Sequence, residues 1–235
     1  DASNKCTLRA AIQEANALAG ADTITLPPGV FQLSLTGTGV DTDAIGDLDI
    51  TEDLTITGAD AISTTIDGQG LLDRVFDIGP NLVPLSIEIN GVTIRNGEVS
   101  GAPGGAIRIN LGTVVLNDCS LSGNSSDANG GAISNGGTLT LNRCTLSANT
   151  ASGNGGGLFN ATTVALNNST LSGNAATSSG GGVYNANTAT LLHASIASNS
   201  ASSGGGLYNA GSAILKSTLL SANTVNNCAG TVAIT

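Results

Sequence analysis

Apolar and polar residues alternate with a period of two over short stretches of the chain, as at Leu139 and Leu141 and again at Cys144 and Leu146. This alternation is typical of short strands with one buried face, whereas a helical stripe needs spacings of three and four. Asn, Gly and Ser residues separate the stretches. The pattern therefore predicts a chain built mainly from short strands joined by tight turns.

The alternating pattern repeats about every 25 residues from Val114 onward. Successive copies begin VVLNDCSLSGN, LTLNRCTLSAN, VALNNSTLSGN and ATLLHASIASN. Copies of this length, each with two or three short strands, fit one turn of a parallel β-solenoid better than a helical repeat. We therefore predict an all-β fold, a single-stranded right-handed parallel β-helix with irregular turns over residues 23–113 and regular turns over residues 114–235.

Asparagines recur at the same period and predict two ladders. When identical turns stack about 4.8 Å apart, each Asn amide can hydrogen-bond the next one and also satisfy a backbone group of the turn. The first predicted ladder contains Asn124, Asn149, Asn174, Asn199 and Asn223, and the second contains Asn110, Asn135, Asn160, Asn185 and Asn209.

The first 22 residues differ from the rest and predict a helix. Leu8, Ala11, Ile12, Ala15 and Leu18 lie at helical spacing on one face, and Gly20 follows as a stop. A solenoid exposes its core and unpaired strand edges at an open end. We therefore expect residues 1–22 to form an N-terminal capping helix.

Composition and charge narrow the function. The formal net charge is −10, and the seven Lys and Arg residues are scattered along the chain. Binding to nucleic acid requires a concentration of basic residues, so nucleic acid is excluded as a partner. No apolar run reaches the roughly 18 residues of a membrane span, so we expect no membrane insertion of this segment.

Two sets of motifs resemble those of exported bacterial proteins. The segment CTLRAAIQEANA, from Cys6 to Ala17, resembles the CSLREA-type opening of bacterial β-helix proteins, with Ala10 where that motif usually has Glu. The segments LSGN, LSAN and IASN, followed by GGAI, GGGL and GGGV, resemble the repeats of polymorphic outer-membrane proteins. This resemblance implies a pectin-lyase-like β-helix at a bacterial cell surface or outside the cell, with an adhesive or stalk role and no catalytic residues.

An aromatic column is the first candidate for binding. Phe159, Tyr184 and Tyr208 recur at the repeat spacing beside residues that should point inward, so the rings should point outward and stack. A structural ladder of rings is the alternative interpretation. The expected partner is a protein or a glycan at a surface, and we expect a non-catalytic, extracellular or surface-exposed module.

The alternative function is a carbohydrate-active enzyme, a polysaccharide lyase or glycoside hydrolase. The regular turns contain only Asp118 and Asp127 as acids, and Arg143 should stack one turn above Asp118 as a surface ion pair. His193 should have no acidic neighbour. A catalytic site would therefore lie in the irregular half, which carries Asp67, Asp73, Arg74, Asp77 and Glu88.

Metal and thiol chemistry receive little support from the sequence. The four cysteines form no zinc-type cluster, and we expect no cofactor apart from the alternative of Ca²⁺ near Asp41, Asp43 and Asp47. Cys119 and Cys144 should be small buried thiols on adjacent turns, because a disulfide there would be poorly directed.

The chain ends in Val232, Ala233, Ile234 and Thr235 without a second capping helix. An uncapped last turn presents unpaired backbone groups and apolar side chains. The expectation is that the polypeptide continues, or that this end associates with another copy end to end.

Overall fold

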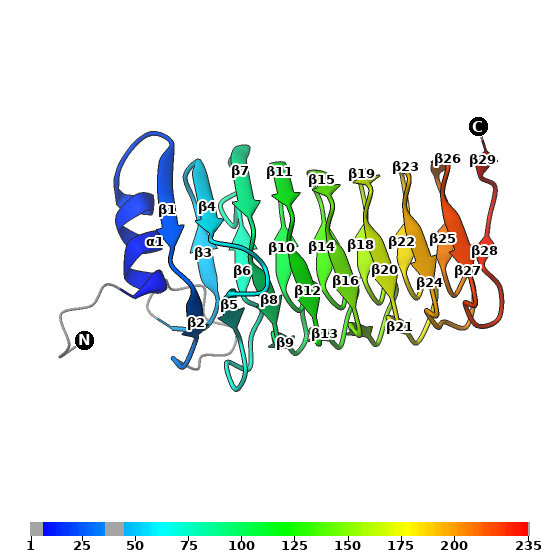
Figure 1. Cartoon of the computed structure of the whole chain (residues 1–235), viewed down its shortest axis with the longest axis horizontal. Coiled ribbons are helices and arrows are strands. Elements are labelled where there is room, and N and C mark those ends of the chain that lie inside the picture. The colour runs from blue at the N-terminus through cyan, green and yellow to red at the C-terminus, as the bar shows by residue number, and fades with distance from the viewer. Residues whose placement is uncertain (1–6, 36–44, 235) are drawn as a thin grey trace.

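The protein is a right-handed parallel β-helix with one short helix at its N-terminal end. The computed structural model describes residues 7–35 and 45–234. The turns of the chain stack along the long axis, with helix α1 (Leu8–Ala17) at one end and the C-terminus at the other (Figure 1). The predicted fold class is confirmed, because the described strands form parallel sheets and α1 is the helix of the described residues.

Four parallel sheets run along the axis, named here A to D. Sheet A contains β1 (Asp22–Leu26), β4 (Leu54–Gly58), β7 (Leu85–Asn90), β11 (Gly112–Asn117), β15 (Thr138–Asn142), β19 (Thr163–Asn167), β23 (Thr188–Leu192), β26 (Ser212–Lys216) and β29 (Ala233–Ile234). Sheet B contains β2 (Gly29–Gln32), β5 (Thr64–Asp67), β8 (Thr93–Arg95), β12 (Ser120–Ser122), β16 (Thr145–Ser147), β20 (Thr170–Ser172), β24 (Ser195–Ala197) and β27 (Leu219–Ser221).

Sheets C and D complete each turn. Sheet C contains β3 (Leu48–Ile50), β6 (Phe76–Ile78), β10 (Ile107–Ile109), β14 (Ile133–Asn135), β18 (Leu158–Asn160), β22 (Val183–Asn185), β25 (Leu207–Asn209) and β28 (Cys228–Ala229). The small sheet D contains β9 (Glu98–Val99), β13 (Ser125–Ser126), β17 (Thr150–Ala151) and β21 (Ala175–Ala176).

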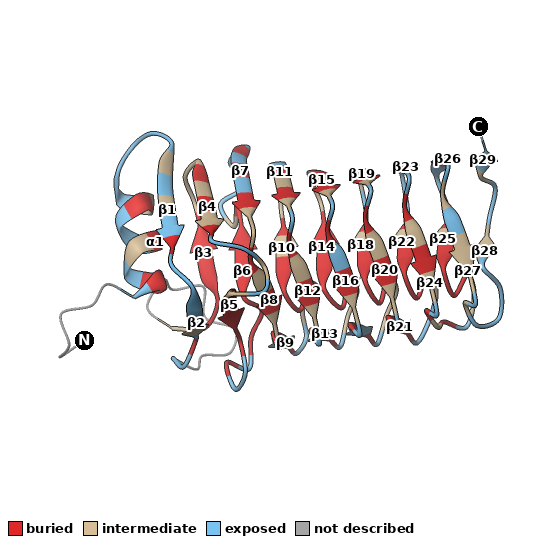
Figure 2. Ribbon diagram, in the orientation of Figure 1, coloured by how far each residue is buried: buried red, intermediate tan, exposed pale blue. Residues whose placement is uncertain are grey.

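The inward positions form one continuous apolar core. Each strand of sheet A in the regular turns buries its second and fourth residues, as Leu139 and Leu141 do in β15. Buried residues face the inside of the solenoid along its whole length (Figure 2). Since burying a Leu side chain contributes about 1.5–3 kcal/mol, a chain with few aromatic residues can still build a stable core from such columns.

The predicted asparagine ladders are present, with one correction. In the first ladder, Nδ2 donates to Oδ1 of the next asparagine at 3.0, 2.9, 2.9 and 3.0 Å from Asn124 to Asn223. In the second ladder the same bond is 2.7 Å at each step from Asn135 to Asn209. The assignment of Asn110 to this ladder was wrong, because Ile109 is the register partner of Asn135 and the Asn110 amide donates to Asp77.

Helix α1 covers the N-terminal end with its buried Leu8, Ile12 and Ala15. Its predicted apolar face extended too far, because the helix ends at Ala17 and Leu18 is 52% exposed. The Thr7 hydroxyl caps the helix by accepting from the Ala10 backbone N–H at 3.2 Å.

Polar side chains of α1 satisfy the outer edge of sheet C. Arg9 donates to the carbonyl oxygens of Gly46 and Asp47. Asn16 donates to the Asp49 carbonyl at 2.8 Å and accepts from the Thr51 backbone N–H at 2.9 Å. Asn16 therefore replaces the neighbouring strand that β3 lacks on this side. Within the described residues, no helix is long and apolar enough to cross a membrane.

Candidate binding face on sheet C

The outward positions of sheet C form one column of side chains along the solenoid. The register of the parallel strands places Asp49, Asp77, Arg108, Ser134, Phe159, Tyr184, Tyr208 and Ala229 in successive rows. The first three rows are charged and the last five are not. The column thus has a charged part in the irregular turns and an uncharged part in the regular ones.

The three aromatic rings of this column stack as predicted. The centroids of Phe159 and Tyr184 are 5.2 Å apart, with 15° between the ring planes, and those of Tyr184 and Tyr208 are 5.1 Å apart, with 4° between the planes. All three side chains are half-buried, whereas their neighbours Leu158 and Val183 are fully buried. We call these three residues the sheet C ridge. Because the ring faces cover one another, the ridge presents ring edges and the two tyrosine hydroxyls to solvent.

Small residues lie on both sides of the sheet C ridge. Two positions after each ring, an exposed alanine begins the turn out of the sheet, and these are Ala161, Ala186 and Ala210. On the other side, Gly180 has a φ of +69°, and a Cβ there would lie 2.7 Å from the Tyr184 Cα. The backbone can approach the ridge this closely only with glycine. The ridge is therefore flanked by low ground rather than by large side chains.

The charged part of the column belongs to a buried ion-pair cluster. The Arg74 Nη1 lies 2.6 Å from Asp47 Oδ2 and 3.1 Å from Asp77 Oδ2, and Arg108 approaches Asp77 at 3.4 Å. Burial, followed by the Asp73 carboxylate, raises the pKa of Asp47 to about 6 in spite of the Arg74 contact. Low exposure of these groups, with Asp47 at 3% and Asp77 at 0%, points to a role inside the fold.

Carboxylate oxygens of Asp47, Asp49 and Asp77 lie within 4.8 Å of one another, a spacing at which they could hold a cation. The guanidinium of Arg74 already bonds two of these three residues and supplies positive charge there. Asp41 and Asp43, the other residues of the predicted calcium site, lie outside the described residues.

The residues considered for catalysis do not converge. Asp67 lies on sheet B and Asp77 on sheet C, whereas Glu88 lies on sheet A and accepts from the Asn117 amide at 3.0 Å. Burial acts to raise the pKa of Asp67, but hydrogen bonds from Asn96, the Gln69 backbone and Arg95 outweigh it and lower the pKa. Asp73 accepts from the Arg74 backbone N–H at 2.8 Å. Each of these acids is thus engaged in a separate local contact.

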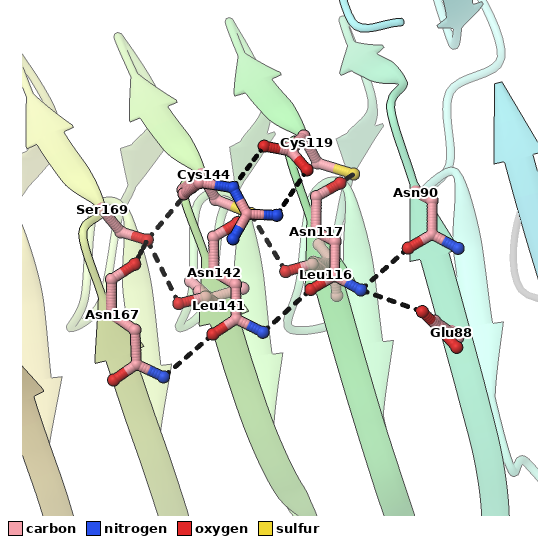
Figure 3. A network of polar contacts seen from close by, with 12 residues as sticks. Glu88, Asn90, Leu116, Asn117, Cys119, Leu141, Asn142, Cys144, Asn167 and Ser169 are labelled. Carbon is pink, nitrogen blue, oxygen red and sulfur yellow. Dashed lines mark hydrogen bonds and ion pairs between the residues drawn. The ribbon is translucent and has the colours of Figure 1, made fainter. Parts of the chain in front are cut away.

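A third asparagine ladder on the outward side of sheet A was missed by the sequence analysis. The amides of Asn117, Asn142 and Asn167 each donate to the preceding asparagine, starting from Asn90, at 2.8, 2.8 and 2.9 Å (Figure 3). These residues have the spacing of the turn, 25 positions from Asn117 to Asn142 and again to Asn167, so the same search would have found them.

The thiols of Cys119 and Cys144 are buried on adjacent turns, as predicted, and no disulfide joins them. Cys144 Sγ donates to the Leu116 carbonyl at 3.3 Å, and the Ser169 hydroxyl makes the equivalent bond to Leu141 one turn later (Figure 3). The hydrogen bond with Cys144 and burial raise the pKa of Cys119. The two thiols therefore act as hydrogen-bond donors within the core.

Charge is distributed unevenly along the solenoid. All 17 Asp and Glu residues occur at or before Asp127, and beyond Arg143 Lys216 is the only Lys or Arg. Arg143 makes the predicted ion pair, a bidentate contact to Asp118 at 2.7 Å for each bond. Both side chains are more than half exposed, so this pair contributes little stability. The ridge lies in the uncharged half of the molecule.

Comparison of the chain with protein-family models, with curated proteins and with solved structures gave no match. The resemblance to bacterial β-helix proteins rests on the short motifs alone.

Proposed function

We propose that this chain is a non-catalytic β-helix module of a bacterial cell surface or the extracellular space, which acts as a stalk and binds through the sheet C ridge. The observation that carries the proposal is the stack of three half-exposed rings on an uncharged face. Aromatic side chains are enriched at protein interfaces because they contribute large contact area at a low cost in conformational entropy.

The alternative of a carbohydrate-active enzyme receives less support from the geometry. A glycosidase needs two carboxyl groups that face one cleft, with the acid and the nucleophile or base on either side of the scissile bond. The closest acids, Asp47, Asp49 and Asp77, are buried, and Arg74 bonds two of them. We therefore favour binding over catalysis.

Cell-surface binding can be tested with the fluorescently labelled chain and two probes, cultured epithelial cells and intact Gram-negative bacteria. We expect saturable binding to at least one probe, and loss of most of it when Tyr184 and Tyr208 are both changed to Ser. Ser195→Ala, on sheet B of a neighbouring segment, should bind like the wild type. Pretreating the cells with protease or with glycosidases would separate a protein partner from a glycan.

Two results would contradict this function. One is the absence of saturable binding to both probes, or binding that survives the loss of both rings. The other is reproducible cleavage of pectin or polygalacturonate, with or without Ca²⁺, that disappears when one of the acids Asp47, Asp49 or Asp77 is changed to Asn.

A further inference from the structure

We propose that the sheet C ridge is the contact surface of a two-fold dimer, in which a second copy of this chain packs antiparallel along it. The inference rests on the proposed use of the ridge as a contact surface, and it names the partner. Three independent features of the face support it, namely the order of its rows, its shape and the position of its charges.

The order of the uncharged rows is self-complementary. From β14 to β28 the outward residues are Ser134, Phe159, Tyr184, Tyr208 and Ala229, with a small residue at each end and rings between them. A two-fold axis at Tyr184 would place Phe159 opposite the partner's Tyr208, and Ser134 opposite the partner's Ala229. An isologous interface needs this property, because the same patch must face itself.

The shape of the face also fits a second copy. The ridge of rings runs parallel to the exposed alanine column of Ala161, Ala186 and Ala210. After a two-fold rotation, the ridge of each copy can lie along the alanine column of the other. Contacts between ring edges and ring faces or alanine methyl groups suit rings whose own faces are largely covered.

The distribution of charge selects the antiparallel arrangement. With the axis at Tyr184, the partner's last row lies opposite Ser134, so the charged rows of Arg108, Asp77 and Asp49 extend beyond the partner. The acidic halves then project in opposite directions. A parallel arrangement would instead set both acidic halves side by side, where charges within a Debye length of about 8–10 Å repel.

The oligomeric state of the purified chain tests the proposal directly. Sedimentation velocity should show a concentration-dependent dimer, and Tyr184→Lys should raise its dissociation constant by about 30-fold or more, because it places two like charges at the axis. Ser195→Lys is the matched control, since Ser195 is also half-buried and outward-facing, but on sheet B. Circular dichroism would show that both variants keep the β-helix.

Cross-linking tests the antiparallel register in a Cys6→Ser, Cys228→Ser background. Under mild oxidation, the Tyr184→Cys variant should link to itself. Phe159→Cys and Tyr208→Cys should link poorly alone and efficiently when mixed. Efficient self-linking of Phe159→Cys would overturn the register, and a wild-type chain that stays monomeric at its highest soluble concentration would overturn the dimer. If that monomer still bound cells through the ridge, the proposed function would stand without the dimer.

Discussion

At the scale of single residues, the buried asparagines of the first ladder make the most hydrogen bonds. Asn149 donates to Asn174 Oδ1 at 2.9 Å and to the Leu121 carbonyl at 3.0 Å. Its own Oδ1 accepts from both the backbone N–H and the amide of Asn124. Because all these groups are shielded from water, loss of the amide would leave several of them without a partner.

We expect Asn149→Ala to lower the free energy of unfolding by about 3 kcal/mol, measured by urea denaturation. Thr150→Ala is the matched control, because Thr150 is exposed and Ala175 occupies its position one turn later. It should change stability by less than about 0.5 kcal/mol. Equal effects of the two substitutions would show that the ladder contributes nothing specific.

A second prediction concerns the residue that precedes each ladder asparagine. Ala148 has a φ of +55°, whereas Gly123 and Gly173 hold the equivalent positions of the neighbouring turns at +63° and +64°. A left-handed conformation costs a residue with a Cβ about 1–2 kcal/mol. Ala148→Gly should therefore raise the free energy of unfolding by about 1 kcal/mol, whereas Ala197→Gly, in strand β24, should lower it. The same urea titration measures both, and destabilisation by Ala148→Gly would contradict the strain argument.

The pKa of Asp47 predicts a dependence of stability on pH. It is raised from 3.8 to about 6, so the folded state takes up this proton before the unfolded state does as the pH falls. The associated stability, up to about 3 kcal/mol, is present below about pH 4 and is lost as the pH rises through 6. Asp47→Asn should remove this component, so unfolding free energies of the two proteins should converge or diverge between pH 4 and 7. A constant difference would contradict the prediction.

At the scale of elements, the capping helix depends on polar contacts as much as on its apolar face. We expect Asn16→Ala to lower the free energy of unfolding by about 2 kcal/mol, because it removes both hydrogen bonds to the outer edge of β3. Hydrogen exchange should speed up in β3 and remain unchanged in β15 and β19. Glu14→Ala, at an exposed position of the same helix, is the control, and similar exchange in both variants would argue against the contact.

The sequence predicted the regular turns well because each has the same length. In that part, spacing along the chain equals register, so the inward leucines, the stacked rings and most ladder asparagines could be assigned. Asn110 failed because the turn at residues 110–112 contains one more residue than the turn at 136–137. The convergence of Asp47, Asp77 and Arg74 was out of reach for the same reason, since the irregular turns differ in length. The contacts of Asn16 depend on which strand edge remains unpaired, which no residue pattern reveals.

At the scale of the whole molecule, the two ends of the solenoid differ. The N-terminal end is covered by α1, but β27, β28 and β29 each form the outer edge of their sheets in the described structure. Leu219 is 58% exposed and Ile234 is 81% exposed, beside a hollow of about 390 Å³. Exposed edge strands without charged residues are templates for another chain.

We therefore expect the 235-residue chain to form species larger than a dimer at high concentration through this end. Leu219→Lys should remove these species in sedimentation velocity experiments, because charge on an edge strand opposes pairing. It should leave the ridge-dependent dimer intact, whereas Tyr184→Lys should do the reverse. Persistence of the larger species in the Leu219→Lys protein would exclude end-to-end association through β27.

The equal length of the regular turns also determines how the molecule would respond to mechanical force. Thr113, Thr138, Thr163 and Thr188 each lie 25 residues apart, and each turn contacts mainly its two neighbours. Tension applied between the chain ends would therefore peel whole turns from an end, one after another. Each turn released would lengthen the chain by about 80–90 Å, so the solenoid would yield in steps of uniform size and serve as an extensible tether.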